Sequence, residues 1–91
     1  MGVNFSDASL KENVRDIEDA LSVIERIRPV EFTFKGDGTE SAGVIAQELE
    51  GVTPQFVRGL DKGILGVDYV ALVGYLLAVV KELAKRLPKE D

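Results

Sequence analysis

The sequence predicts an α+β fold in which short strands, a hairpin and one short helix precede a long C-terminal helix that packs against other copies of the chain. Short runs of alternating apolar and polar residues indicate the strands, and apolar residues three and four positions apart indicate the helices. The last helix begins with residues 70–80, which are apolar on every side. Such a helix must be covered all round, and a chain of 91 residues has little material for that.

The N-terminal stretch is expected to form a short strand and then the start of a helix. Val3 and Phe5 alternate with polar neighbours, and the alternation stops at Asp7. Ser9 and Glu12 have the spacing of a capping box, in which two side chains satisfy free amides at a helix N-terminus.

The first helix is predicted over residues 17–27. Its apolar positions at helical spacing are Ile17, Leu21, Ile24 and Ile27. The helix must end near Arg28, because Pro29 lacks an amide hydrogen and disfavours helical geometry in the residue before it.

Strand signals dominate the middle of the chain. Residues 30–35 alternate in polarity, and 36–38 read Gly-Asp-Gly, a turn sequence. Residues 43–45 favour a second strand, and the chain is then expected to make a short helical turn through Gln47 and Leu49. Residues 55–69 are predicted to form a hairpin around Asp-Lys-Gly at 61–63.

The long helix is expected over residues 69–87, with Asp68 as its N-cap and Pro88 beyond its end. Its apolar positions with a three-four spacing suit a seam between parallel helices. These positions are Leu72, Leu76, Val79, Leu83 and Leu87.

Composition excludes several function classes. The chain has no cysteine and no histidine, so disulfides, thiolate or histidine metal sites and a Ser-His-Asp triad are excluded, and no metal or cofactor is expected. A net charge of -5 has the wrong sign for a nucleic-acid partner. The longest apolar run has 11 residues, whereas crossing a bilayer takes about 20, so no membrane partner and no anchor are expected.

Ser6 and Lys11 form the candidate reactive pair. On a helix, residues five apart point about 140° away from each other, and on a strand they lie on opposite faces. The two side chains can therefore meet only across a bend, which the change from strand to loop at 7–9 supplies. The alternative is that Ser6 is only a polar residue ahead of a helix.

Lys11 can act as a base only if its pKa is lowered, because about one free lysine in a thousand is neutral near pH 7. Burial against apolar side chains lowers the pKa of a lysine, and Leu10, Val14 and the apolar helix are the candidates. Pairing with Asp7 or Glu12 would instead keep the amine charged.

Four short blocks in a fixed order resemble a known family: SDASLKEN at 6–13, RPVEFTF at 28–34, GVIAQEL at 43–49 with a following Pro54, and VDY at 67–69. The segments "FSDASLKENVRDIEDALSVIERIRPVEFTFK", "GVIAQELEGVTPQFV" and "GVDYVALVGYLLAVVKEL" are similar to the intramolecular chaperone auto-processing domain. This is the C-terminal self-cleaving peptidase domain of phage tailspikes, tail fibres and endosialidases, which is also present in myelin regulatory factor. The resemblance covers nearly the whole chain.

The resemblance implies a homotrimer that guides folding and assembly of the β-rich fibre or tailspike preceding it in the same polypeptide, and then cuts itself off. Residues 1–91 are accordingly expected to be a single domain, in which residues 1–5 are a remnant of the upstream fibre or of an expressed segment that begins near the junction. Assembly is expected in the host cytoplasm, with the mature fibre in the virion tail and the chaperone domain released.

The resemblance also implies the catalytic residues. Ser6 and Lys11 match the family's Ser-Lys dyad, and the scissile bond is most simply that between Phe5 and Ser6. Ser6 is expected to attack the carbonyl, and Lys11 to accept the hydroxyl proton and return it to the leaving amine. Asp7 matches the family's Asp, which either caps the turn or takes part in the chemistry.

Other motif residues have auxiliary expectations. Gln47 either donates to the developing oxyanion, as an auxiliary group of the site, or satisfies nearby backbone. Asn13 and Glu48 are expected to be structural hydrogen-bonding residues, while Asp68 and Tyr69 start the last helix.

Two other functions remain open on the sequence. One is a homotrimerisation module of a fibrous protein that never cuts, in which Ser6 and Asp7 only cap a turn. The other is a monomeric binding module with the long helix as its own core.

Overall fold

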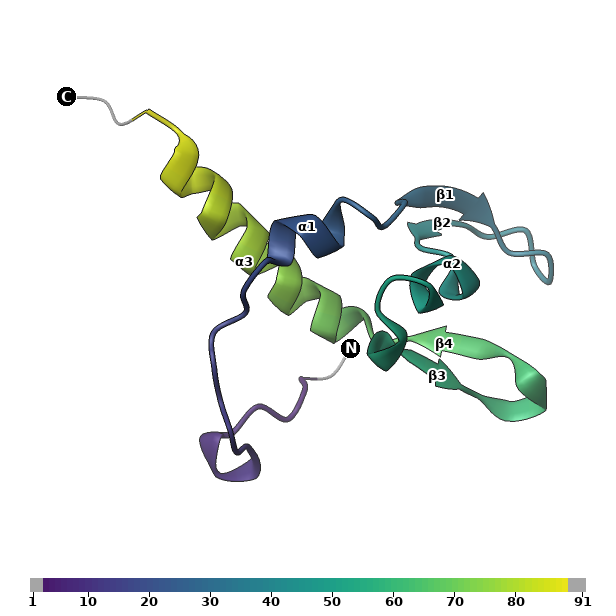
Figure 1. Cartoon of the computed structure of the whole chain (residues 1–91). Coiled ribbons are helices and arrows are strands. Elements are labelled where there is room, and N and C mark those ends of the chain that lie inside the picture. The colour runs from purple at the N-terminus through teal and green to yellow at the C-terminus, as the bar shows by residue number, and fades with distance from the viewer. Residues whose placement is uncertain (1–2, 89–91) are drawn as a thin grey trace.

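A computed structural model describes residues 3–88 of the chain and has the expected α+β architecture (Figure 1). Two antiparallel hairpins lie near the first turns of a long C-terminal helix, and a short helix packs across the middle of that helix. The elements in order, with η denoting a 3₁₀ turn, are η1 Ala8–Leu10, α1 Ala20–Ile24, β1 Val30–Thr33, β2 Glu40–Gly43, α2 Ala46–Glu50, η2 Pro54–Phe56, β3 Val57–Gly59, η3 Asp61–Gly63, β4 Leu65–Val67 and α3 Tyr69–Arg86.

The first hairpin pairs β1 with β2 around the predicted turn. Val30 lies opposite Gly43 and Thr33 opposite Glu40. The amide of Phe34 donates to the carbonyl of Thr39 at 2.8 Å and closes the turn. The second strand was predicted at 43–45 and lies earlier, because a strand paired through this turn must begin directly after it and because α2 follows from Ala46.

The second hairpin, β3 with β4, confirms the prediction for residues 55–69. Val57 lies opposite Val67, and Gly59 opposite Leu65. Lys62 and Gly63 both have positive φ, at 61° and 74°. Consecutive left-handed residues match the right-handed twist of paired strands, which is why Asp-Lys-Gly reverses the chain here.

The long helix α3 begins where predicted and ends one residue before the predicted Leu87. The Asp68 Oδ1 accepts a hydrogen bond from the Ala71 amide at 3.0 Å, so Asp68 is the N-cap. Helix α1 and turn η2 pack on α3, and the rings of Phe56 and Tyr75 meet edge to face with centroids 5.2 Å apart. The buried apolar residues of the described part are Ala20, Leu49, Leu72 and Val79.

The N-terminal predictions are partly wrong. Residues 3–6 form no strand, because they have no partner strand. The predicted helix over 17–27 is reduced to α1, because Asp19 lies in the left-handed region at φ 56° and breaks the helical path before Ala20. No capping box forms, since Ser9 is inside η1 and donates to Asp7. We call residues 3–19 the N-terminal arm.

The predicted seam on α3 is partly covered by its own chain. Leu72 and Val79 are each only 7% exposed, because they pack inside their own chain. A second face, centred on Val73, Leu77 and Val80, lies about 100° around the helix and is exposed. We call it the open face of α3; the exposed apolar residues of the helix and its end are Tyr69, Val70, Val73, Leu76, Leu77, Val80, Leu83 and Leu87.

A close contact between Gly43 and Tyr69 joins β2 to the start of α3. The Tyr69 hydroxyl accepts a hydrogen bond from the Val44 amide at 3.2 Å. A Cβ atom added at Gly43 would contact the Tyr69 hydroxyl and lie 3.2 Å from Cζ of the ring. The absence of a side chain at position 43 therefore allows the two elements to meet.

We predict that Gly43→Ala lowers the free energy of unfolding by about 1–3 kcal/mol, the usual cost of overpacking. Urea denaturation at a fixed protein concentration measures it. In a Tyr69→Phe background the loss should be smaller, because the clashing hydroxyl is gone. Gly59→Ala is the matched control, since a Cβ at this strand glycine meets nothing within 4 Å. Equal losses at positions 43 and 59 would contradict the prediction.

Candidate active site

The structure brings Ser6 and Lys11 together on the N-terminal arm. The Lys11 Nζ lies 2.7 Å from the Ser6 Oγ, and the amine donates a hydrogen bond to the hydroxyl oxygen. In a reaction the direction would reverse, with a neutral amine accepting the hydroxyl proton. Their catalytic role remains a prediction, but the required distance is present.

The bend that allows this contact is η1. The amide of Leu10 donates to the Asp7 carbonyl at 3.0 Å, and the amide of Lys11 donates to the Ala8 carbonyl at 3.1 Å. The Asp7 carboxylate caps the turn by accepting from the Ser9 amide at 2.9 Å and the Ser9 hydroxyl at 2.6 Å. These two bonds, the hydroxyl first, lower the pKa of the Asp7 carboxyl. Capping, one of the two roles expected for Asp7, is therefore observed.

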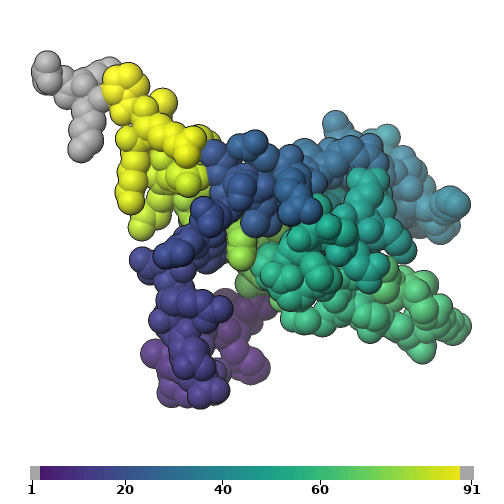
Figure 2. Space-filling model, viewed as in Figure 1, coloured from purple at the N-terminus to yellow at the C-terminus, as the bar shows by residue number. Residues whose placement is uncertain are grey.

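The expected burial of Lys11 does not occur within one chain. Leu10 and Val14, the side chains expected to cover the amine, are 67% and 80% exposed. Figures 1 and 2 show the turn of the arm standing apart from the hairpins and from most of α3. Within residues 3–88, Lys11 forms no ion pair with Asp7 or Glu12, so the pairing that would hold the amine charged is also not formed.

Gln47 is not brought to Ser6 within the chain. It lies on α2 at a groove between the two hairpins, with Phe32, Ile45 and Tyr69 among its neighbours, and no residue of the arm lines this groove. A donor role for Gln47 therefore has no geometric basis in a single chain.

The two residues expected to be structural differ in their contacts. Glu48 forms a bidentate ion pair with Arg28, with Nε–Oε1 and Nη2–Oε2 distances of 3.0 and 2.6 Å. This pair ties the Arg-Pro-Val block to the helical turn α2. Asn13 has φ 55°, and its carbonyl, rather than its side chain, accepts from Arg15 at 3.3 Å.

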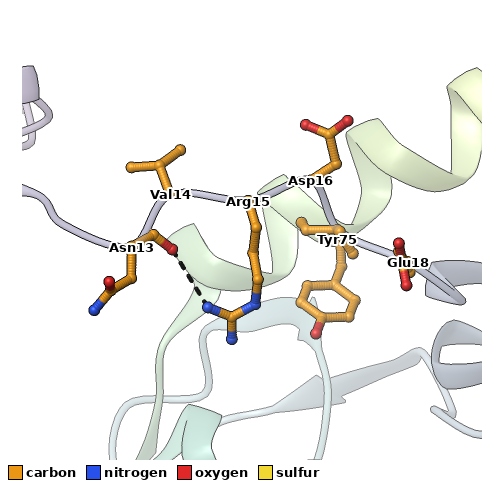
Figure 3. Close-up of a pocket in the computed structure, with 7 residues that line it drawn as sticks. Asn13, Val14, Arg15, Asp16, Glu18 and Tyr75 are labelled. Atoms are coloured by element: carbon orange, nitrogen blue, oxygen red, sulfur yellow. Dashed lines mark hydrogen bonds between the residues drawn. The ribbon is translucent and has the colours of Figure 1, made fainter.

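A shallow pocket that no sequence motif indicated lies between the arm and α3 (Figure 3). Arm residues 13–18 run past Tyr75 of α3, whose ring lies beside the Arg15 side chain. Neighbouring side chains of opposite charge, Arg15 with Asp16 and Glu18, line it. The pocket marks where the arm crosses α3.

The described residues offer no other obvious centre of chemistry. No cluster of three or more carboxylates in residues 3–88 is arranged to hold a metal ion. In the same residues, no helix combines the length and apolar character needed to cross a bilayer.

Comparison with known proteins identifies the family of the chain. Residues 6–58 match a peptidase family described as the chaperone of endosialidase. Because the match covers more than half of the chain, the protein belongs to this family. It is also similar to the long tail fiber protein Gp37 of Enterobacteria phage K3 and to that of Enterobacteria phage T2, with 36% identity to each over 91 aligned positions. The alignments cover 90% of this chain but only 7% of each fibre protein.

The Arg28–Glu48 pair should make stability depend on pH in the acidic range. Arg28 lowers the pKa of the Glu48 carboxyl, first through the hydrogen bonds and then through its charge. The stabilisation is therefore present above the ordinary Glu pKa of about 4.3 and is lost as the pH falls through the lower folded value.

We predict that Glu48→Gln flattens the dependence of the unfolding free energy on pH below about 5, measured by urea denaturation across a pH series. Both side chains are substantially exposed, so the effect at neutral pH should be small. Glu50→Gln, on the same helical turn, is the control and should keep the slope of the unchanged protein. If Glu48→Gln also keeps that slope, the pair does not contribute to it.

Proposed function

We propose that this protein is a C-terminal intramolecular chaperone that trimerises, guides folding and assembly of an upstream phage tail fibre or tailspike segment, and releases itself by Ser-Lys autoproteolysis next to Ser6. The observation that carries the proposal is the 2.7 Å contact between the Lys11 amine and the Ser6 hydroxyl. Membership of the chaperone of endosialidase family and similarity to two long tail fibre proteins support it.

The proposed reaction cuts the bond between Phe5 and Ser6. The neutral Lys11 amine takes the Ser6 hydroxyl proton while Oγ attacks the Phe5 carbonyl carbon. The tetrahedral intermediate collapses by breaking the bond between the Phe5 carbonyl carbon and the Ser6 nitrogen. That nitrogen receives the proton back from Lys11 and becomes a free amine. Water then hydrolyses the resulting ester to the Phe5 carboxylate and the Ser6 hydroxyl. Because nucleophile and target share one chain, proximity supplies much of the acceleration.

Trimerisation is supported by how much surface one chain leaves open. A compact monomer of this mass exposes about 5,200 Å², whereas this chain exposes 7994 Å². Its radius of gyration is 16.1 Å, against about 12 Å for a compact domain of this length. The open face of α3 would be buried if three such helices packed together around a common axis.

Three copies of this domain, associated as a trimer that we call the clamp, would bring three fibre chains into register before the fibre folds. Intertwined β-structure has many non-local contacts. Closing the long loops between them costs conformational entropy, which slows folding. Cutting afterwards would leave the fibre kinetically trapped, since it could no longer use the clamp to disassemble. In this proposal assembly takes place in the host cytoplasm, and the fibre remains in the virion tail after the chaperone leaves.

One observation favours a second candidate, a trimerisation module that does not cut. Lys11 is exposed to solvent in the single chain, and Leu10 and Val14, the side chains expected to cover it, are exposed as well. In this alternative the contact with Ser6 is only part of a capped turn.

We predict that the protein extended at its N-terminus by its natural upstream segment is cleaved between Phe5 and Ser6. Intact mass and N-terminal sequencing over time should show a fragment that begins at Ser6. Ser6→Ala and Lys11→Met should each abolish it, whereas Ser41→Ala and Lys35→Met, at exposed positions of the first hairpin, should not. An extended chain that folds and trimerises yet stays intact would favour the second candidate.

We predict that the protein sediments as a trimer of its 9.9 kDa chain. Leu77→Gln with Val80→Gln should shift it toward monomer, because both side chains belong to the open face of α3. Lys81→Gln with Lys85→Gln is the matched control on the same helix and should remain trimeric. A 9.9 kDa species for the unchanged protein would remove the clamp from the proposal.

A further inference from the structure

The turn between Ser6 and Lys11 is held by a side chain that lies between them in sequence. One oxygen, Oδ1 of Asp7, accepts two hydrogen bonds from Ser9, from its amide at 2.9 Å and from its hydroxyl at 2.6 Å. Ser9 thus uses both of its donors on the same carboxylate.

We propose that Asp7 and Ser9 are positioning residues for the Ser6–Lys11 pair: Asp7 holds the turn, and Ser9 engages the Asp7 carboxylate so that it does not pair with the Lys11 amine. Neither side chain touches the reacting atoms in this scheme. The inference rests on the proposed autoproteolysis. It adds that turn η1 sets both the approach of Lys11 to Ser6 and the charge near the Lys11 amine.

The first step of the argument is that the turn is local. The hydrogen bonds that shape η1 run among residues 7–11. The element pairs that pack closely in the structure do not include η1. Since a pair five residues apart meets only across a bend, and little else contacts this bend, the Asp7–Ser9 bonds hold the approach of Lys11 to Ser6.

The second step concerns charge. The charged side chains of the arm nearest to Lys11 in sequence are Asp7, Glu12 and Arg15, and within residues 3–88 none of the salt bridges includes Lys11. A carboxylate within about 4–6 Å of a lysine favours its charged form and so weakens it as a base. Asp7 is the acidic residue adjacent to Ser6, and the two Ser9 bonds compete for its oxygen.

The third step is that this arrangement persists at neutral pH. The Ser9 bonds lower the pKa of the Asp7 carboxyl, so the group stays ionised and remains a strong acceptor. The turn and the engagement of the carboxylate therefore depend on the same two bonds.

Three substitutions in the extended, cleaving protein separate the two roles. Asp7→Ala removes both the turn acceptor and the charge, and should slow cleavage about tenfold, the size expected for losing a hydrogen bond to a charged group. Asp7→Asn keeps an oxygen for the Ser9 amide and should restore most of the rate. Ser9→Ala leaves the charge but removes one donor, and should shift the rising limb of the pH–rate profile to higher pH; adding Asp7→Asn to Ser9→Ala should remove that shift.

Asp37→Ala is the matched control. Its carboxylate accepts from the Thr39 amide at 2.9 Å in the turn between β1 and β2, which is the same side-chain contact two residues along, away from the dyad. It should leave both rate and profile unchanged. If Asp7→Ala and Ser9→Ala behave like Asp37→Ala, the positioning role is wrong.

A second readout keeps this inference separate from the proposed function. In the 91-residue protein, NMR titration of the Lys11 side chain reports its protonation without any cleavage. Ser9→Ala should raise the midpoint, adding Asp7→Asn to Ser9→Ala should remove that rise, and Asp37→Ala should leave the midpoint unchanged. An extended chain that never cuts, combined with these shifts, would overturn the autoproteolysis and leave the control of Lys11 intact; unmoved midpoints would overturn the control of Lys11.

Discussion

Burial of α3 is the main constraint on the fold, because its first half is apolar on every side, while α1 and η2 are the elements of residues 3–88 that pack most extensively against it. The side of α3 that carries Leu72 and Val79 is buried by these contacts, whereas the open face stays exposed. The arm does not fill the gap, since Val3 and Phe5 at its start are almost fully exposed. A neighbouring copy that packed against the open face and the start of the arm would bury both of these exposed regions.

The geometry of the candidate dyad depends on a local turn, whereas its reactivity depends on burial by more distant parts of the protein or by another copy. A capped turn of a few residues is enough to place the Lys11 amine against the Ser6 hydroxyl. Making that amine a base requires removing it from water, and the side chains next to it, Leu10 and Val14, do not do so in one chain. A dyad assembled locally but activated only by a neighbour would be inactive before assembly, which is the order that a removable clamp requires.

Short sequence patterns correctly predicted several features that depend on interactions between neighbouring residues. The turn at 61–63, the cap at Asp68 and the meeting of Ser6 with Lys11 each depend on a few consecutive residues. The predicted helix over 17–27 was too long because nothing in its periodicity indicates that Asp19 turns left-handed. Periodicity likewise gave the spacing of the α3 seam without revealing which side its own chain covers. The separation of Gln47 from Ser6 depends on tertiary arrangement, which no local pattern encodes.

The sequence blocks that carry the family resemblance divide into two groups by their contacts. Arg28 with Glu48, and Tyr69 with the Gly43–Val44 backbone, connect three blocks through specific polar contacts. The block containing Ser6 and Lys11 makes its side-chain hydrogen bonds within itself. Similarity in the three connected blocks therefore reports the scaffold, whereas the proposed cleavage depends on the block that contains Ser6 and Lys11. A relative that keeps the scaffold residues but lacks a counterpart of Ser6 or Lys11 should retain this fold and remain uncleaved.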